Sequence, residues 1–140
     1  MAAEGALAHL LSASDRALVE AAVEAVRARY RYGRHTVGAA VRGASGRLFT
    51  AVNLDATVGR AAVCAEAVAL GAAVMAGESG IEAVVAVRHP RPDEPGPVAV
   101  VSPCGACREL LLDHAGGCAV IMPGRGRVPI RDLLPGPYRR

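Results

Sequence analysis

The stretch SPCGACREL, residues 102–110, places two cysteines three positions apart, directly after a proline and at the start of an apolar run. Such a pair can be a redox couple, part of a structural zinc clip or part of a catalytic metal site. A redox couple needs only Cys104 and Cys107, whereas a metal site needs further ligands. We therefore searched the rest of the chain for a third ligand.

A second motif, CAE, lies upstream at the start of the apolar segment 64–77. Three thiols at the starts of two helices can hold one tetrahedral ion and leave its fourth position open, as catalytic zinc requires. Glu66 follows Cys64 by two residues, close enough to meet a water molecule at the open position without being a ligand. The two motifs together allow an open metal site formed by Cys64, Cys104 and Cys107, with Glu66 next to it.

Length and composition predict one globular domain over residues 1–140. Hydrophobic residues make up 52% of the chain, mostly as Ala and Val, and aromatic residues only 3%. All 16 basic residues are Arg, and they are scattered along the sequence rather than collected in a run. The net charge of +3 therefore does not indicate a nucleic-acid partner.

The N-terminal stretch 1–15 lacks a basic segment followed by a sustained apolar one, and no window is long enough to span a bilayer. We therefore expect a cytoplasmic protein with no membrane partner. In a reducing compartment, four cysteines are more often metal-binding or catalytic than disulfide-bonded.

Hydrophobic periodicity and turn signals predict an alternation of helices and strands. We expect helices at 14–30, at 64–77 and from the paired cysteines to residue 115. We expect strands on either side of the turn in 37–53 and at 81–88, 98–101 and 118–123. This order predicts an α/β fold, a three-layer sandwich with helices packed on a mixed five-stranded sheet.

The motifs CAE and SPCGACREL resemble the zinc-dependent cytidine deaminase family, in its three-cysteine, small-subunit class. The resemblance extends upstream through VGAAVRGASGRLFTAVN, residues 37–53, and downstream to RDLLPGPY, residues 131–138. It implies a cytidine deaminase-like fold and the zinc-dependent hydrolysis of cytidine or deoxycytidine to the uridine product and ammonia. It also implies a homotetramer and a free cytosine nucleoside, not a nucleic acid, as the substrate.

The same resemblance assigns roles to individual residues. Glu66 would take a proton from the attacking water and pass protons to the base N3 and the departing ammonia. The expected substrate contacts are Asn53 and Asp55 at the ribose, backbone groups of Ala65 and Ser102 at the base, and His35 at a wall of the base pocket.

Three motifs depart from the family pattern. The common Asn-x-Glu-Asn is Asn53-Leu54-Asp55-Ala56 here, and the usual Phe-Pro before the first strand is His35-Thr36. An arginine usually follows the Cys-Ala-Glu triplet and offsets thiolate charge, but position 67 is Ala. We expect Arg108 to supply that charge instead.

These departures leave alternatives open. Because it lacks that arginine, CAEAVALG also resembles blasticidin S deaminase, a relative that acts on a cytosine nucleoside antibiotic, so a modified cytosine compound is the alternative substrate. A catalytically silent, zinc-stabilised binding module is a third hypothesis, which retention of Glu66 disfavours.

Cys118 is expected to be a buried strand residue, and Tyr138 either a frayed tail residue or an aromatic that reaches a neighbouring subunit.

Overall fold

One mixed sheet forms the middle of the molecule in the computed structural model, which describes residues 7–140. Six strands follow the order β2-β1-β3-β5-β6, with β4 paired to β3 off this path. The strands are β1 (Val37–Gly43), β2 (Leu48–Val52), β3 (Ile81–Arg88), β4 (Ala99–Val101), β5 (Ala119–Met122) and β6 (Gly126–Pro129). Among the strands of the described residues, only β3 and β5 pair in parallel, and the connection between them includes the crossover helix α4 that such pairing requires.

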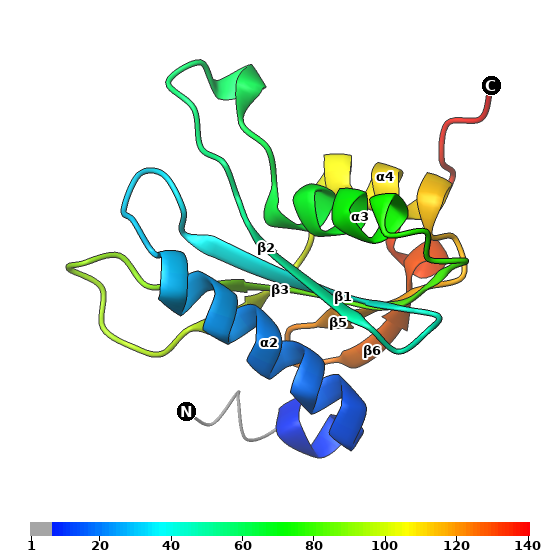
Figure 1. Ribbon diagram of the computed structural model, residues 1–140, viewed down its shortest axis with the longest axis horizontal. Helices are drawn as coiled ribbons and strands as arrows, with labels where there is room; N and C mark the ends of the chain where they lie inside the picture. The colour runs from blue at the N-terminus through cyan, green and yellow to red at the C-terminus, as the bar shows by residue number, and fades with distance from the viewer. Residues whose placement is uncertain (1–6) are drawn as a thin grey trace.

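Helices cover both faces of this sheet (Figure 1). Helix α2 (Ala13–Arg29) lies on one face, and α3 (Ala65–Met75) and α4 (Gly105–His114) lie side by side on the other. Two hydrophobic clusters result, because alternate residues of a strand point to opposite faces. On β3, Val84 joins the cluster beneath α3 and α4, whereas Val85 joins the one beneath α2. The predicted three-layer α/β sandwich is confirmed.

The first helix starts and packs as its sequence predicts. The Ser12 hydroxyl accepts the Asp15 backbone N–H at 3.1 Å and so caps α2. The helix buries an apolar stripe that includes Ala22 and Val26. It approaches β1 so closely that a Cβ atom on Gly38 would collide with the Ala22 carbonyl oxygen. A glycine is therefore needed at this crossing point.

An ion-pair network centred on the buried Asp15 and Arg42 joins α2 to the sheet. Asp15 accepts from the Arg42 guanidinium at 2.7 Å and from Arg127 at 3.1 Å, and Arg42 also donates to Glu82. Burial alone would raise the pKa of Asp15, but the hydrogen bonds from the two arginines outweigh it and hold that pKa below its ordinary value. The network therefore fixes the α2 layer with charge as well as with apolar contact.

The sheet has one strand more than expected. Strand β6 follows β5 through a tight turn with positive φ at Gly124 and Gly126, and the two strands pair antiparallel. Its four residues, GRVP, bury only Gly126 and Val128, so the sequence lacks the apolar run by which the other strands were recognised.

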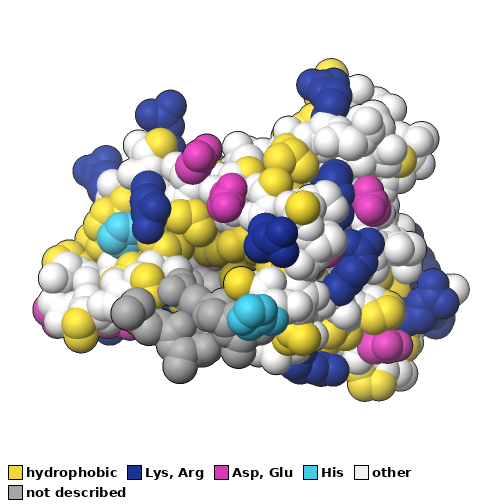
Figure 2. Space-filling view, turned by 90° about the horizontal axis from the view of Figure 1, so that it is seen from below, with side chains coloured by type: hydrophobic (Ala, Val, Ile, Leu, Met, Phe, Trp, Pro, Cys, Tyr) yellow, Lys and Arg dark blue, Asp and Glu magenta, His cyan; other side chains and the backbone are white. Residues whose placement is uncertain are grey.

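None of the helices in the described part of the chain is long and apolar enough to cross a membrane. Figure 2 shows the α2 side of the molecule, where arginines are dispersed among hydrophobic and acidic side chains rather than aligned in one stripe. The expected cytoplasmic location was based on the N-terminal stretch 1–15, and residues 1–6 of that stretch lie outside the described range.

Candidate metal centre and active site

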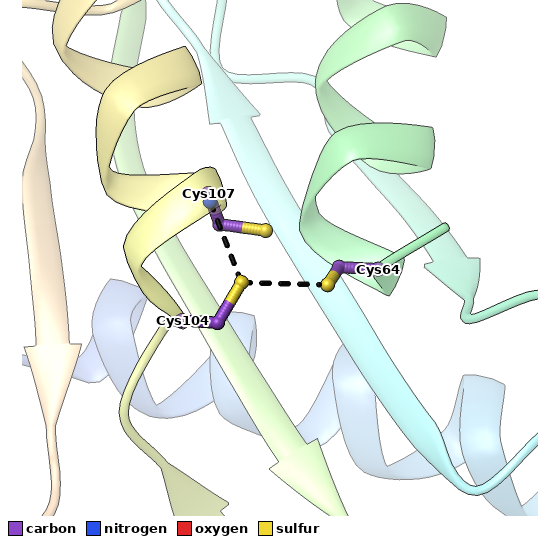
Figure 3. A group of neighbouring side chains, drawn as sticks. All are labelled: Cys64, Cys104 and Cys107. Carbon is purple, nitrogen blue, oxygen red and sulfur yellow. Dashed lines mark hydrogen bonds between the residues drawn. The ribbon is translucent and has the colours of Figure 1, made fainter. Parts of the chain in front are cut away.

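The N-termini of α3 and α4 bring three cysteines together (Figure 3). Cys64 is the N-cap residue of α3 and Cys104 that of α4, while Cys107 lies in the first turn of α4. The Cys64 and Cys104 Sγ atoms are 3.5 Å apart, and the three sulfur atoms all lie within 4.8 Å of one another. These distances allow all three sulfurs to contact a single ion with tetrahedral Zn–S bonds.

The thiols differ in how readily they ionise. Burial would raise the pKa of Cys104, but the Cys107 backbone N–H, 3.5 Å from the Cys104 sulfur, and other hydrogen bonds outweigh it and lower that pKa. Burial raises the pKa of Cys64 and of Cys107, and the neighbouring Cys104 and Glu66 add to this effect. A bound cation would remove that obstacle, so the donor set fits a metal dication such as zinc.

Glu66 lies in the first turn of α3 and is only 5% exposed. Among the described residues, the other buried charged side chains are Asp15 and Arg42, which pair with each other. Glu66 has no ion-pair partner in that part of the chain. Burial raises its pKa above the ordinary value for a glutamate. An unpaired buried carboxylate beside metal ligands is a feature of a reactive site.

A cavity of about 220 Å³ opens at this point. Polar and charged residues on its wall are Asn53, Glu66 and Ser102, together with Cys64 and Cys104. The remaining lining residues are small or apolar: Val37, Ala62, Val63, Ala65 and Val101. The cavity is therefore a mostly apolar pocket with a few convergent polar groups at the metal-binding end, which is typical of small-molecule sites.

Some of the predicted site residues lie in this cavity and others do not. Asn53, Ala65 and Ser102 line it, as does Glu66. His35 lies behind Asn53, with its Nδ1 atom 2.8 Å from the Asn53 carbonyl oxygen. Asp55 is exposed, and its Oδ1 accepts from the next backbone N–H, that of Ala56, at 2.8 Å.

Arg108 supports the loop that carries the paired cysteines. Its Nε donates to the Pro103 carbonyl oxygen and its Nη1 to the Leu133 carbonyl oxygen, each at 3.0 Å. The guanidinium thus links the residue before Cys104 to the C-terminal segment.

Two residues named from the sequence lie apart from the three-cysteine group. Cys118 is a buried residue just before β5, and burial raises its pKa to about 11. It is not a member of the three-cysteine group. Tyr138 is 82% exposed on the C-terminal segment.

Four cavity residues were not singled out from the sequence: Val37, Ala62, Val63 and Val101. All four lie next to segments that the sequence analysis recognised. Val37 begins the segment 37–53, Ala62 and Val63 precede Cys64, and Val101 precedes Ser102. Apolar residues next to a motif carry no signal that distinguishes a pocket wall from core. Only the folded chain identifies them.

An α/β sandwich that holds three thiols and an unpaired carboxylate at two helix N-termini, beside a small cavity, defines a zinc-dependent hydrolase. Residues 12–122 match the family described as "Cytidine and deoxycytidylate deaminase zinc-binding region". The chain belongs to this family, and it is a hydrolytic deaminase that acts on a C–N bond, with zinc as the cofactor of the Cys64, Cys104 and Cys107 group.

Individual relatives agree with this assignment. The chain is 43% identical over 134 residues to the blasticidin-S deaminase of Bacillus cereus, covering 93% of this chain and 96% of that protein. It is 33% identical over 108 residues to the cytidine deaminase of Mycobacterium tuberculosis, covering 76% and 75%. The crystal structure of the cytidine deaminase from Mycobacterium leprae superposes with a TM-score of 0.74 at 30% identity, over 89% of this chain and 99% of that one.

Proposed function

We propose that this enzyme removes the C4 amino group of a free cytosine nucleoside, with cytidine and deoxycytidine as substrates and the uridine product and ammonia as products. One observation carries the proposal: the buried carboxylate of Glu66 and two of the three metal-binding thiols, those of Cys64 and Cys104, line a cavity of about 220 Å³ together with Asn53 and Ser102. A cavity of that size suits a small molecule rather than a polymer.

Cys64, Cys104 and Cys107 would hold the zinc ion. When bound, zinc lowers the pKa of a water molecule and so makes it a nucleophile at neutral pH. The N-terminus of α4 stabilises thiolate charge on Cys104 through the backbone N–H of Cys107. Arg108 donates to the Pro103 carbonyl oxygen and thereby keeps a positive charge close to the N-terminus of α4, where Cys104 and Cys107 lie. It takes this role in place of the arginine that is absent at Ala67.

Glu66 would carry the protons of the reaction. Its carboxylate accepts one proton from the attacking water and delivers it to N3 of the base. It then transfers the second proton of that water to the amino nitrogen, so that a C4–O bond replaces the C4–N bond and ammonia departs. Its burial supports this role, because a carboxylate sheltered from bulk water exchanges protons with the bound substrate rather than with solvent.

Substrate orientation would fall to the other polar groups on the wall. Ala65, Ser102 and Asn53 line the cavity, which supports base contacts by the backbone groups of Ala65 and Ser102 and a sugar contact by the Asn53 carboxamide. Asp55 remains a candidate for the sugar hydroxyls, although in the single chain its side chain turns to its own loop.

A second candidate substrate is a cytosine nucleoside antibiotic of the blasticidin S type. The 43% identity to a blasticidin-S deaminase extends over 96% of that protein, whereas the 33% identity to a cytidine deaminase extends over 75%. The exposed Asp55 and the loss of the second amide at Ala56 favour the same alternative, since both alter the expected sugar contacts.

The two candidates are separated by ultraviolet absorbance. Zinc-loaded protein is mixed in parallel with cytidine, deoxycytidine, cytosine and blasticidin S, and absorbance loss and ammonia are followed. Loss with cytidine or deoxycytidine supports the first candidate, and loss with blasticidin S alone supports the second. If none of the four compounds loses absorbance or releases ammonia, the proposal is contradicted.

The proposed assembly is a homotetramer of this single domain, acting in the cytoplasm in pyrimidine salvage. Support comes from α3, whose only charged residue, Glu66, is buried. Its other side is apolar and open, with Val74 58% and Met75 88% exposed. A second copy of the chain packed on this side would remove an apolar surface from water.

A further inference from the structure

The orientation of the Asn53 side chain is fixed by its neighbours. Its Oδ1 atom accepts two backbone N–H groups, that of Thr36 at 2.8 Å and that of Val37 at 3.0 Å. An NH2 group in that place would set donor against donor, so the oxygen must lie there. The NH2 group is then the polar part of Asn53 that remains for the cavity it lines.

His35 holds the same residue from its backbone side. The His35 Nδ1 atom is 2.8 Å from the Asn53 carbonyl oxygen, and because a carbonyl only accepts, Nδ1 carries the proton. The Asn53 backbone N–H in turn donates to the Val37 carbonyl oxygen at 3.0 Å. Asn53 is therefore held at its carbonyl, its amide and its side-chain oxygen by residues 35–37.

The His35 backbone is itself tied into a closed turn. The Arg31 N–H donates to the His35 carbonyl oxygen at 3.0 Å, and the His35 N–H donates to the Arg31 carbonyl oxygen at 2.9 Å. His35 is half-buried, and it is not one of the residues that line the cavity. Its ring thus reaches the cavity only through Asn53.

We propose that His35 is a positioning residue for substrate binding, which acts by fixing Asn53 so that its NH2 group points into the cavity. The proposal rests on the function proposed above and replaces the direct substrate contact expected for His35 from the sequence. One consequence is a requirement on the substrate, because the atom that faces Asn53 must accept a hydrogen bond. A sugar hydroxyl or a ring oxygen meets this requirement.

The test uses two substitutions of similar shape. Asn keeps an N–H donor at the δ position of residue 35, whereas Leu has the same branching with no donor. His35→Leu should raise KM for the nucleoside that the enzyme turns over by about tenfold with kcat nearly unchanged, since an orienting hydrogen bond acts on bound substrate and transition state alike. His35→Asn should restore a KM near that of the wild type. Equal KM values for the wild type and His35→Leu would overturn the proposal.

A double substitution tests whether His35 acts through Asn53. Asn53→Asp keeps the oxygen that accepts from Thr36 and Val37 but removes the NH2 donor. In the Asn53→Asp background, His35→Leu should raise KM by less than twofold, because the group it positions is gone. A full tenfold rise in that background would show an independent effect of His35 and contradict the proposal. Thermal melting of each variant establishes that it is folded.

Nitrogen NMR supplies a readout that needs no turnover. The Nδ1 atom of His35 should carry a proton, and the Asn53 side-chain NH2 resonance should shift in His35→Leu but not in His35→Asn. An Nε2–H tautomer, or an Asn53 resonance indifferent to both substitutions, would refute the positioning role. If the wild type deaminates none of the nucleosides, the proposed function fails, and the NMR result still decides the role of His35.

Discussion

At the scale of single residues, Glu66 differs from the other buried charges in what surrounds it. Asp15 and Arg42 form an ion pair with each other. Glu66 lies beside thiols and a cavity, and no cationic side chain in the described part of the chain pairs with it. Burying a carboxylate without a partner destabilises a fold. A purely structural role would not favour glutamate at this position, so the chemistry of the site explains its presence.

Glu66→Gln should lower kcat by about a hundredfold to ten-thousandfold, the usual contribution of a general acid–base group. The substitution removes the proton acceptor and keeps the shape of the side chain, so zinc content should stay at the wild-type level. Activity is measured by absorbance and zinc by atomic emission. Glu109→Gln, on the exposed side of α4, is the matched control and should behave as wild type.

The cysteines provide a second comparison. Cys107→Ser should lose stoichiometric zinc and with it the activity, because one of three converging ligands is gone. Cys118→Ser should keep one zinc per chain, since the Cys118 thiol is outside the group. Equal zinc content in the two variants would show that the ligand set is wrong.

The sequence predicted the metal ligands of the site but not the contacts between the residues that surround them. Cysteine spacing is a one-dimensional signal, and the three thiols converge because two helices begin at them. The interaction of His35 with Asn53 joins residues 18 positions apart and depends on which ring nitrogen faces which oxygen. No pattern in the sequence encodes that geometry, which has to be read from the folded chain.

At the scale of elements, segments with a clear hydrophobic pattern predicted the bounds of helices and strands to within a residue or two. The expected helix over 14–30 is Ala13–Arg29, and the expected strand over 81–88 is Ile81–Arg88. Strand β6 was missed because it pairs with β5 through its backbone and buries only one side chain of the core, that of Val128. Short edge strands of this kind lack a hydrophobic period, so tertiary context decides them.

The ion-pair network beneath α2 gives a prediction about stability. Asp15→Ala should lower the free energy of unfolding at neutral pH by about 3 kcal/mol, because two arginines lose their buried partner. Chemical denaturation measures the loss. Asp113→Ala, an exposed site on α4, serves as the control and should leave the free energy of unfolding nearly unchanged.

The pH dependence of this difference follows from the lowered pKa of Asp15. A carboxylate whose folded pKa lies below its ordinary value of 3.8 stabilises the protein fully above that value. The contribution is lost as the pH falls through the lower pKa of the folded state. The gap between wild type and Asp15→Ala should therefore close in strong acid, and a gap independent of pH would contradict the electrostatic account.

At the scale of the whole molecule, the open side of α3 is the surface through which we propose that copies of the chain associate. Val74→Asp places a charge on this apolar surface and should shift the proposed homotetramer to smaller species, because a buried unpaired charge is costly. Light scattering after size exclusion measures the mass. Leu48→Asp, on β2, adds the same charge elsewhere and is the control. A wild-type mass for Val74→Asp would place the interface on another surface.

The most direct test of the central claim is the origin of the oxygen in the product. Zinc-loaded enzyme is incubated with cytidine, and in parallel with blasticidin S, in water labelled with heavy oxygen, and the product is examined by mass spectrometry. The account predicts one labelled oxygen at C4 and one ammonia released per product molecule. An unlabelled product, or no ammonia from either compound, would contradict hydrolytic deamination at this site.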